Sequence, residues 1–203
     1  MPRRPRRSSS RPAAGLRLIG GEWRGRRLAV AERPGLRPTP DRVRETLFNW
    51  LAPRIAGSRC LDLFAGTGAL GLEALSRGAG HVTFVDTDRA ATAAIEAALV
   101  TLGAGARGHA VTADAGAQAA AAGPFDIVFI DPPFDADLHA GAVAAIAPRL
   151  APGARLYLEY PAARQAHIEA LLADDFDLLR ARRAGAVGYC LAQPGARSED
   201  SRP

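Results

Sequence analysis

The sequence contains no lysine, only two cysteines and few aromatic residues. All 26 basic residues are arginines, which, with so much alanine and glycine, indicates genomic base composition and not a function. Cys60 and Cys190 lie far apart inside predicted strands, a pattern typical of buried reduced thiols and not of a disulfide framework or a metal site. No apolar run approaches the roughly 20 residues that a membrane span needs. We therefore expect a cytoplasmic monomer with no metal and no membrane association.

The charge of the chain is unevenly distributed. Residues 1–44 contain 13 arginines and three acids, a net charge of +10, whereas the rest of the chain has a net charge of −5. A cationic front end on an acidic body indicates a polyanionic partner held at one end of the molecule. The alternative is a solvated basic tail without a partner. Residues 1–15 are rich in Arg, Pro and Ser, and residues 194–203 are polar, so we expect both ends to be disordered.

The hydrophobic periodicity predicts a small N-terminal extension over residues 16–55. Leu16–Ile19 and Arg27–Val30 flank several glycines and predict a β-hairpin. Asp41 is expected to N-cap a helix that ends near Leu51. One face of that helix should carry Val43, Leu47, Trp50 and Leu51.

Residues 56–193 alternate between strand and helix patterns and predict one α/β domain. Strands are expected near 59–64, 81–86, 109–113, 125–131 and 154–160, with helices near 69–77, 89–102, 115–122, 137–149 and 163–173. Two last strands, near 176–182 and 186–192, should pair antiparallel. Repeated strand–helix units require a mostly parallel sheet that is covered on both faces. The predicted fold is Rossmann-like and doubly wound.

A glycine-rich turn follows the first strand and predicts a cofactor site. Gly66, Gly68 and Gly71 form a G-x-G-x-x-G pattern, and the second strand ends in Asp86, which would bind a ribose hydroxyl. Asp62 discriminates between cofactors, because a carboxylate beside this turn would repel the pyrophosphate of a dinucleotide. It would attract S-adenosylmethionine, which carries a cationic amino group and a sulfonium. A dinucleotide oxidoreductase is the rival interpretation.

Other residues around this turn complete the predicted cofactor set. Phe64, Ala65 and Thr67 lie within the turn itself. Asp114 ends the third strand and would either accept from the adenine amino group or cap the following helix. Asp88 is expected to N-cap the helix after the second strand.

The predicted reacting centre is the turn Asp131-Pro132-Pro133-Phe134, which follows the fourth strand directly. In a doubly wound sheet the first and fourth strands are neighbours, so Asp62 and Asp131 should face one crevice. Asp131 and the carbonyl of Pro132 would accept the N–H groups of an exocyclic amine and aim its lone pair at a sulfonium methyl group. Phe134 offers a face on which an extruded base can stack. The turn does not distinguish adenine, cytosine and guanine.

Two further stretches, residues 17–26 (RLIGGEWRGR) and 35–49 (GLRPTPDRVRETLFN), together with these motifs, resemble the RsmD methyltransferases. Members of that family make N2-methylguanine in bacterial small-subunit (16S) ribosomal RNA. The resemblance spans roughly residues 16–192 and implies a seven-stranded sheet whose last two strands form the expected hairpin. It also implies that Asp62, the glycine turn, Asp86 and Asp114 serve S-adenosylmethionine, and that residues 131–134 serve the guanine. Asp86 stands where glutamate is expected in relatives.

The resemblance also implies an RNA-contacting surface. Arg37, Thr39, Arg42 and Arg44 look like phosphate and loop contacts at the mouth of the site. The alternative is a solvated helix start with salt bridges to Glu45. Ribosomal RNA, within the small subunit or an assembly intermediate, is the expected partner. A DNA adenine methyltransferase and a non-catalytic RNA-binding assembly factor remain the rival functions.

Overall fold

A sheet of seven strands forms the centre of the protein. The structure, a computed structural model, describes residues 15–29, 40–121, 123–134 and 137–195. The strand order is β5-β4-β3-β6-β7-β9-β8; the pairs from β5 to β7 are parallel, and β9 runs antiparallel to both β7 and β8. From one edge to the other, the strands are β5 (Gly108–Thr112), β4 (His81–Asp86), β3 (Arg59–Asp62), β6 (Phe125–Ile130), β7 (Leu150–Pro161), β9 (Val187–Pro194) and β8 (Phe176–Ala184). The predicted mostly parallel sheet and its closing antiparallel hairpin are confirmed.

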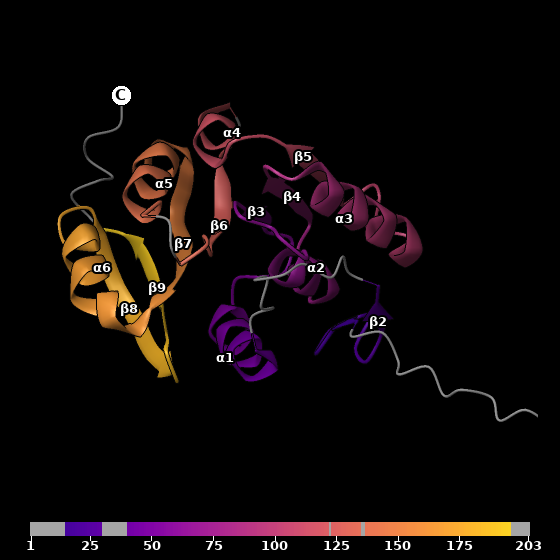
Figure 1. Cartoon of the computed structure of the whole chain (residues 1–203), viewed down its shortest axis with the longest axis horizontal. Coiled ribbons are helices and arrows are strands. Elements are labelled where there is room, and N and C mark those ends of the chain that lie inside the picture. Colours follow the sequence, from indigo (N-terminus) through magenta and orange to yellow (C-terminus); the bar gives the residue numbers. More distant parts are fainter. Residues whose placement is uncertain (1–14, 30–39, 122, 135–136, 196–203) are drawn as a thin grey trace, which may run out of the picture.

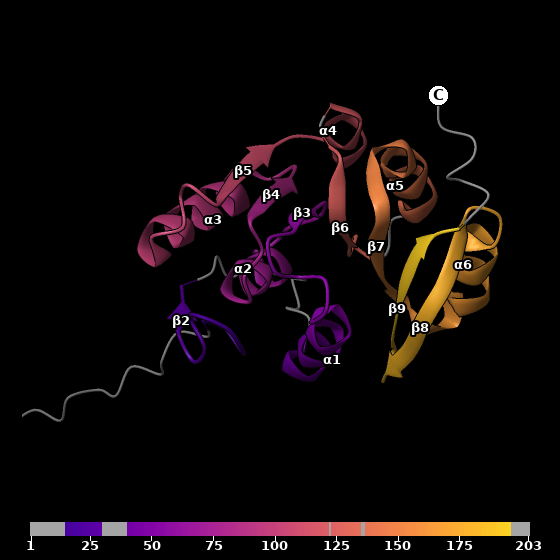
Figure 2. The ribbon, with the colours of Figure 1, turned by 180° about the vertical axis from the view of Figure 1, so that it is seen from behind.

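Helices cover both faces of this sheet, as Figures 1 and 2 show. Side chains of α1, α2 and α3 share one hydrophobic core with one face, and side chains of α4, α5 and α6 share a second core with the other. The helices are α1 (Asp41–Leu51), α2 (Ala69–Ser76), α3 (Arg89–Leu102), α4 (Ala115–Ala121), α5 (His139–Ile146) and α6 (Gln165–Leu172), with single 3-10 turns at Ala147–Arg149 and Ala162–Arg164. Within the described ranges, no helix is long and apolar enough to cross a membrane.

Burial on both faces explains why the central strands carry runs of consecutive apolar residues, such as Cys60-Leu61 and Ile127–Ile130. In β3 and β6, consecutive side chains point to opposite cores, and nearly all of them are buried. Cys60 and Cys190 are both buried and unbridged, and burial raises the pKa of each thiol to about 12. The prediction of buried, reduced thiols is confirmed.

The N-terminal hairpin is shorter than its sequence pattern predicts. Its strands are β1 (Leu16–Arg17) and β2 (Arg27–Leu28), paired antiparallel. The backbone N–H groups of Ile19 and Gly20 donate to the carboxylate of Glu73 on α2, so they do not extend the β1–β2 ladder. Val30 lies outside the described residues. These two bonds attach the hairpin to α2.

Helix α1 differs from the prediction at its start. Pro40 is the N-cap residue and makes no side-chain cap bond, so the prediction that Asp41 caps the helix is wrong. Proline has no side-chain oxygen, so Pro40 cannot cap the helix with its side chain. Asp41 is the first helical residue, and its carboxylate accepts from Arg44 Nη2 at 2.7 Å.

The buried face of α1 also differs by one aromatic residue. Val43, Leu47, Phe48 and Leu51 are buried, whereas Trp50 is half-buried and stacks on Tyr189 of β9 with ring centroids 5.6 Å apart. This packing places α1 against β9. Of the ends expected to be disordered, residues 1–14 and 196–203 lie outside the described residues, as does the segment 30–39, whereas Pro194 is the last residue of β9, so the expected disorder there is wrong.

Candidate active site at the carboxyl edge of the sheet

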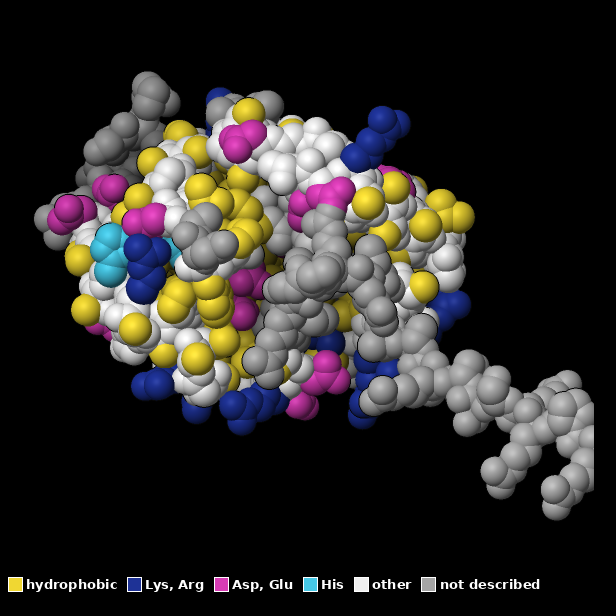
Figure 3. All heavy atoms as spheres, in the orientation of Figure 1, with side chains coloured by type: hydrophobic (Ala, Val, Ile, Leu, Met, Phe, Trp, Pro, Cys, Tyr) yellow, Lys and Arg dark blue, Asp and Glu magenta, His cyan; other side chains and the backbone are white. Residues whose placement is uncertain are grey.

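The strand order places three aspartates at one edge of the sheet. β3 pairs with β4 on one side and with β6 on the other, which is the switch point of a doubly wound sheet. Asp62 and Asp86 end β3 and β4, and Asp131 directly follows β6. On the face that Figure 3 shows, acidic side chains lie among hydrophobic ones in the middle of the molecule, whereas arginines gather along its lower margin. The pairing of β3 with β6 confirms the predicted convergence of Asp62 and Asp131.

Asp62 lies at the most buried point of this edge. Its side chain is 2% exposed, and its Oδ2 accepts from the backbone N–H of Gly71 at 2.9 Å. Its pKa is raised to about 7, mainly by burial and to a smaller extent by the nearby charges of Asp131 and Asp86, although the Gly71 bond opposes the rise. The carboxylates of Asp131 and Asp86 thus repel the ionised form of the buried Asp62. A cationic ligand would relieve that repulsion, and a pyrophosphate would increase it.

The three glycines of the turn have two distinct roles. Gly66 and Gly68 have φ angles of 51° and 75°, in the left-handed region that favours glycine. A Cβ on Gly71 would lie 2.2 Å from Cε1 of Phe84, so this glycine allows α2 to approach β4 closely. The turn therefore presents its backbone to a ligand and brings α2 onto the sheet, as the fingerprint requires.

Asp86 holds the glycine turn in place. Its Oδ2 accepts from Gly66 N–H and its Oδ1 from Asp88 N–H, each at 2.8 Å. A carboxylate has about four acceptor positions, so these two bonds leave it able to accept from a ribose hydroxyl. Asp88 caps α3 by accepting from Ala90 N–H, which confirms that prediction.

Asp114 caps a helix in the structure. Its Oδ1 accepts from the backbone N–H groups of Gly116 and Ala117 at the start of α4, at 2.9 and 3.2 Å. The structure thus bears out the capping alternative. Because the side chain is also exposed, the contact with an adenine amino group stays a prediction.

The Asp131–Phe134 turn lies beside Asp62, at the end of the adjacent strand. Asp131 is half-buried, Pro132 is buried, and Phe134 is 42% exposed although it is a large apolar residue. The two prolines fix the backbone between Asp131 and Phe134. An acceptor carboxylate, a stiff backbone and an exposed aromatic ring therefore occur together, which is the arrangement that binding a planar amine requires.

Two buried acids are not among the site residues predicted from the sequence. Glu73 lies in the apolar helix α2, and Glu159 lies in the apolar strand β7; they are 0% and 4% exposed. The signal in each case is a single charge inside a run of hydrophobic residues, LGLEALS and LYLEYP. A buried charge requires partners, so both positions merit a structural or functional explanation. Within the described part of the chain, no group of three or more His, Cys, Asp or Glu residues is placed to hold a metal ion.

The prediction that Arg44 contacts RNA is wrong. Its side chain is only 1% exposed, because it lies on the same side of α1 as Leu47 and Phe48, which face the core. Its Nη2 donates to Asp41 Oδ1 and to the carbonyl of Arg17, and its Nη1 lies 3.9 Å from Glu73 Oε2.

The structure describes one of the other three predicted RNA contacts. Arg42 is exposed, as a phosphate contact requires. Arg37 and Thr39 lie outside the described residues.

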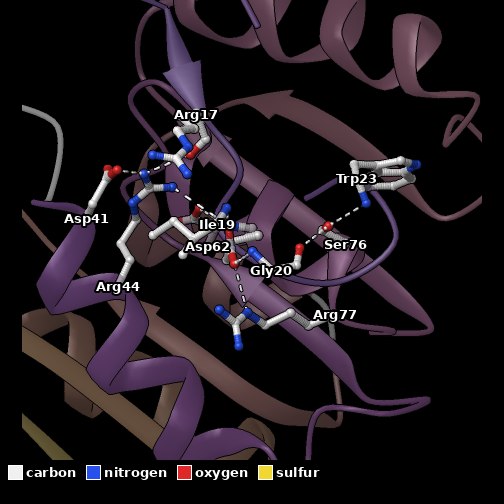
Figure 4. A network of polar contacts seen from close by, with 11 residues as sticks. Arg17, Ile19, Gly20, Trp23, Asp41, Arg44, Asp62, Ser76 and Arg77 are labelled. Atoms are coloured by element: carbon white, nitrogen blue, oxygen red, sulfur yellow. Dashed lines mark hydrogen bonds and ion pairs between the residues drawn. The ribbon is translucent and has the colours of Figure 1, made fainter. Parts of the chain in front are cut away.

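Glu73 joins the hairpin, α1 and α2 in one polar network, which Figure 4 shows. Its Oε1 accepts from Gly20 N–H at 2.8 Å and from Arg77 Nε at 2.7 Å, and its Oε2 accepts from Ile19 N–H at 2.8 Å. In Figure 4, Arg44 lies between Asp41 and Arg17, and Arg77 approaches from the opposite side. The network satisfies the buried carboxylate and fixes the hairpin beside α1.

A groove of about 430 Å³ lies between the hairpin and α1. Arginines line it from the hairpin and from the end of α2, and polar side chains one helical turn apart line it from α1. These residues are Arg17, Arg24, Arg77, Asp41, Glu45 and Asn49. The arginine wall suits the phosphates of a nucleic acid, whereas the α1 wall, with Asp41 and Glu45, is acidic and suits donor groups such as base amines.

Comparison of the sequence with known proteins gives evidence that is independent of the geometry of the site. The family described as Conserved hypothetical protein 95 matches residues 16–193. The Ribosomal RNA small subunit methyltransferase D of Escherichia coli K12 is 45% identical over 190 residues, which cover 91% of this chain and 92% of that protein. The protein of the same name from Haemophilus influenzae is 40% identical over 184 residues, covering 88% and 93%.

Solved structures agree with this result. The structure of yhhF from Escherichia coli, to which methyltransferase activity is ascribed, superposes with a TM-score of 0.79 at 45% identity. The match covers 90% of this chain and 99% of that one. The fold is therefore that of the Rossmann-like methyltransferases.

Proposed function

The chain belongs to the RsmD family of methyltransferases, and we propose that it transfers the methyl group of S-adenosylmethionine to N2 of a guanine in bacterial 16S ribosomal RNA. The observation that carries the proposal is the position of Asp62 and Asp131 at the carboxyl ends of two adjacent strands, close enough for their charges to interact. One carboxylate faces the cofactor turn and the other begins the amine-binding turn. The names of the most similar relatives support ribosomal RNA as the substrate.

The residues around the glycine turn fit S-adenosylmethionine. Asp62 would take the cationic amino group, the backbone of residues 64–68 would line the ligand, and Asp86 would accept from the ribose. When bound, the cofactor supplies an electrophilic methyl group on a cationic sulfur. The repulsion among Asp62, Asp86 and Asp131 supports a cationic ligand over a dinucleotide.

The Asp131 turn would bind and orient the target amine. The lone pair of an exocyclic amine is delocalised into the base ring, so the nitrogen is a poor nucleophile. Asp131 and the carbonyl of Pro132 accept its two N–H groups and thereby localise the lone pair and fix its direction. Phe134, exposed at the mouth, stacks on the base after it leaves its helix.

We propose that the RNA lies across the N-terminal extension, residues 16–55, and that residues 56–193 carry the chemistry. Arg42 on α1 and the arginines of the groove, Arg17, Arg24 and Arg77, would contact phosphates. Arg37 and Thr39 stay proposed contacts on the resemblance alone. The proposed substrate is the small subunit or its assembly intermediate, and the proposed enzyme is a cytoplasmic monomer.

The test is methyl transfer from tritiated S-adenosylmethionine to four substrates. These are small subunits from a strain that lacks this gene, 16S ribosomal RNA free of protein, duplex DNA with adenine targets, and subunits from the wild-type strain. We expect label in the first substrate, at a single guanine when the RNA is digested and analysed by mass spectrometry. Subunits from the wild-type strain, already methylated, should accept none. Label in duplex DNA alone would establish the rival adenine methyltransferase, and no label in any substrate would favour a non-catalytic assembly factor.

A further inference from the structure

Glu159 lies next to Asp131 across the β6–β7 pair. The two strands are parallel, and Ile130 pairs with Leu158, so the residues that follow them, Asp131 and Glu159, lie side by side at the carboxyl edge. Glu159 belongs to β7, and the amine-binding turn begins where β6 ends. A second acid is therefore adjacent to the proposed reacting centre.

Both acids are on the side of the sheet that α1 and α2 cover. Phe129 and Tyr157 pair across β6 and β7, contact each other edge to face at 6.4 Å, and belong to the core on that side. Asp131 and Glu159 each come two residues later, and alternate residues of extended chains point to the same face. The pKa of Tyr157 is raised well above its usual value of 10, first by burial and then by Glu159 and Asp131. Both carboxylates are thus close to one hydroxyl group.

Glu159 is held rigidly in this position. The hydroxyl of Tyr157 donates to Oε2 of Glu159 at 2.9 Å, and Nε2 of His139 donates to its backbone carbonyl at 2.8 Å. A bond to a carbonyl requires a proton on Nε2, which fits a neutral His139, whose pKa is lowered by burial. The side chain is 4% exposed, and a carboxylate can accept about four hydrogen bonds. The carboxylate therefore has a fixed direction at the same edge of the sheet as Asp131.

The position and chemistry of Glu159 correspond to the edge of guanine that carries the target amine. In guanine, the N1–H lies next to the N2 amine, so the N1–H and one N–H of the amine point the same way, while the second N–H of the amine points away from N1. In adenine, the ring nitrogen next to the amine is an acceptor with no hydrogen. A carboxylate accepts hydrogen bonds and donates none, so it favours guanine and repels the corresponding edge of adenine.

We propose that Glu159 is the residue that selects guanine, by accepting the N1–H of the target base while Asp131 holds its N2 amine. This inference rests on the proposed function and deepens it, because the Asp131 turn alone does not distinguish among bases. Tyr157 is a positioning residue that aims the carboxylate. No proton or bond is transferred through Glu159.

The experiment compares two target bases that both carry a 2-amino group. A 16S ribosomal RNA is ligated from a synthetic fragment that contains guanine or 2-aminopurine at the target position, and is tested free and in reconstituted subunits. 2-Aminopurine has the amine but an unprotonated N1. Wild-type enzyme should methylate guanine about a hundredfold faster or more, since a site built around a donor rejects an analogue that lacks it.

The substitution Glu159→Gln should reduce this preference. A glutamine amide can donate to the unprotonated N1, so methylation of guanine should fall about tenfold or more while methylation of 2-aminopurine stays equal or rises. Glu169→Gln, an exposed change on α6, is the matched control and should keep the wild-type ratio. Binding of S-adenosylhomocysteine by both variants reports whether each has folded.

The possible results separate the two proposals. Equal loss on both bases in Glu159→Gln would make Glu159 a structural residue and overturn the inference while guanine methylation stands. If that variant does not fold, the wild-type comparison decides, because a preference for guanine below about threefold excludes a donor-reading site. Absence of guanine methylation by the wild-type enzyme would instead overturn the proposed function.

Discussion

The substitution Asp62→Asn tests the electrostatics of the cofactor site. Asn keeps the shape of the side chain and an oxygen that can accept from Gly71 N–H, but it cannot ionise. In the folded protein the pKa of Asp62 is raised from 3.8 to about 7. Each pKa unit corresponds to about 1.4 kcal/mol, so ionised Asp62 lowers the free energy of unfolding by about 4 kcal/mol.

The direction of the pH dependence follows from the raised pKa. Between pH 4 and pH 7, on the cited values, the folded protein holds a proton on Asp62 that the unfolded chain has lost. The free energy of unfolding therefore falls as pH rises through this range and levels off above about pH 7. Asp62→Asn should lack this contribution, so its advantage in stability over the wild type should grow from pH 4 to pH 7.

Cofactor affinity should change in the opposite direction. A cationic ligand prefers the ionised carboxylate, so wild-type affinity for S-adenosylmethionine should fall about tenfold per pH unit below pH 7 and be constant above it. At pH 8, Asp62→Asn should bind about ten- to a hundredfold more weakly, the loss expected for a hydrogen bond to a charged group. Its affinity should also be independent of pH.

Titration calorimetry and urea unfolding at pH 5, 6, 7 and 8 measure both effects. Near pH 7, binding to the wild type should release about half a proton, which calorimetry detects by repeating the titration in buffers of different ionisation enthalpy. Asp174→Asn, an exposed change between α6 and β8, should leave affinity and its pH dependence unaltered. Wild-type affinity that is flat from pH 6 to pH 8, together with unchanged binding by Asp62→Asn, would refute the reasoning.

Three further predictions concern the reaction and the RNA. Asp131→Ala should lower turnover about a hundredfold or more, because a fixed acceptor is lost, while calorimetry finds nearly unchanged cofactor affinity; wild-type turnover would contradict the role. Arg42→Ala should weaken RNA binding and reduce the slope of affinity against salt by about one unit. Arg44→Ala should instead lower the free energy of unfolding by about 3 kcal/mol, since it removes a buried side chain and its hydrogen bonds to Asp41 and the Arg17 carbonyl; equal effects of these two substitutions on the salt slope would count against the assignment. Removing residues 1–14 should flatten the salt dependence modestly without changing cofactor binding, and an unchanged slope would mean that these arginines take no part.

The parts of the fold set by local pattern could be predicted from the sequence. The glycine turn, the cap at Asp88 and the strand–helix alternation each depend on residues close together in the chain. The convergence of Asp62 and Asp131 is a longer-range prediction, and it succeeded because doubly wound sheets have few allowed strand orders.

Apart from the helix start at Asp41, the failures involve side chains whose partners are distant in the sequence. Arg44 belongs to an arginine-rich segment and looks like a phosphate contact, but its partners include the Arg17 carbonyl, 27 residues away. Glu73 accepts from Ile19, 54 residues away, and no local pattern indicates that bond. Glu159 could have been noticed as a lone acid in an apolar strand, but its nearness to Asp131 requires the register of β6 and β7. The charge distribution of the sequence indicated where the basic surface lies. Which arginines of that segment face solvent depends on burial in the folded protein.

The Glu73 network limits how this enzyme can be divided or re-engineered. A fragment beginning at residue 56 would keep the cofactor turn and every aspartate of the crevice, yet it would lose the two hairpin N–H donors and Arg44. The carboxylate of Glu73 would then remain inside α2 with Arg77 as its one remaining partner among those described above. Exchange of the hairpin between relatives, as a route to new RNA targets, should therefore succeed only when the donor hairpin preserves the backbone at Ile19 and Gly20. Loop residues of the hairpin, such as Arg24, are free of that constraint, so substitutions there should reduce the stability of the fold least.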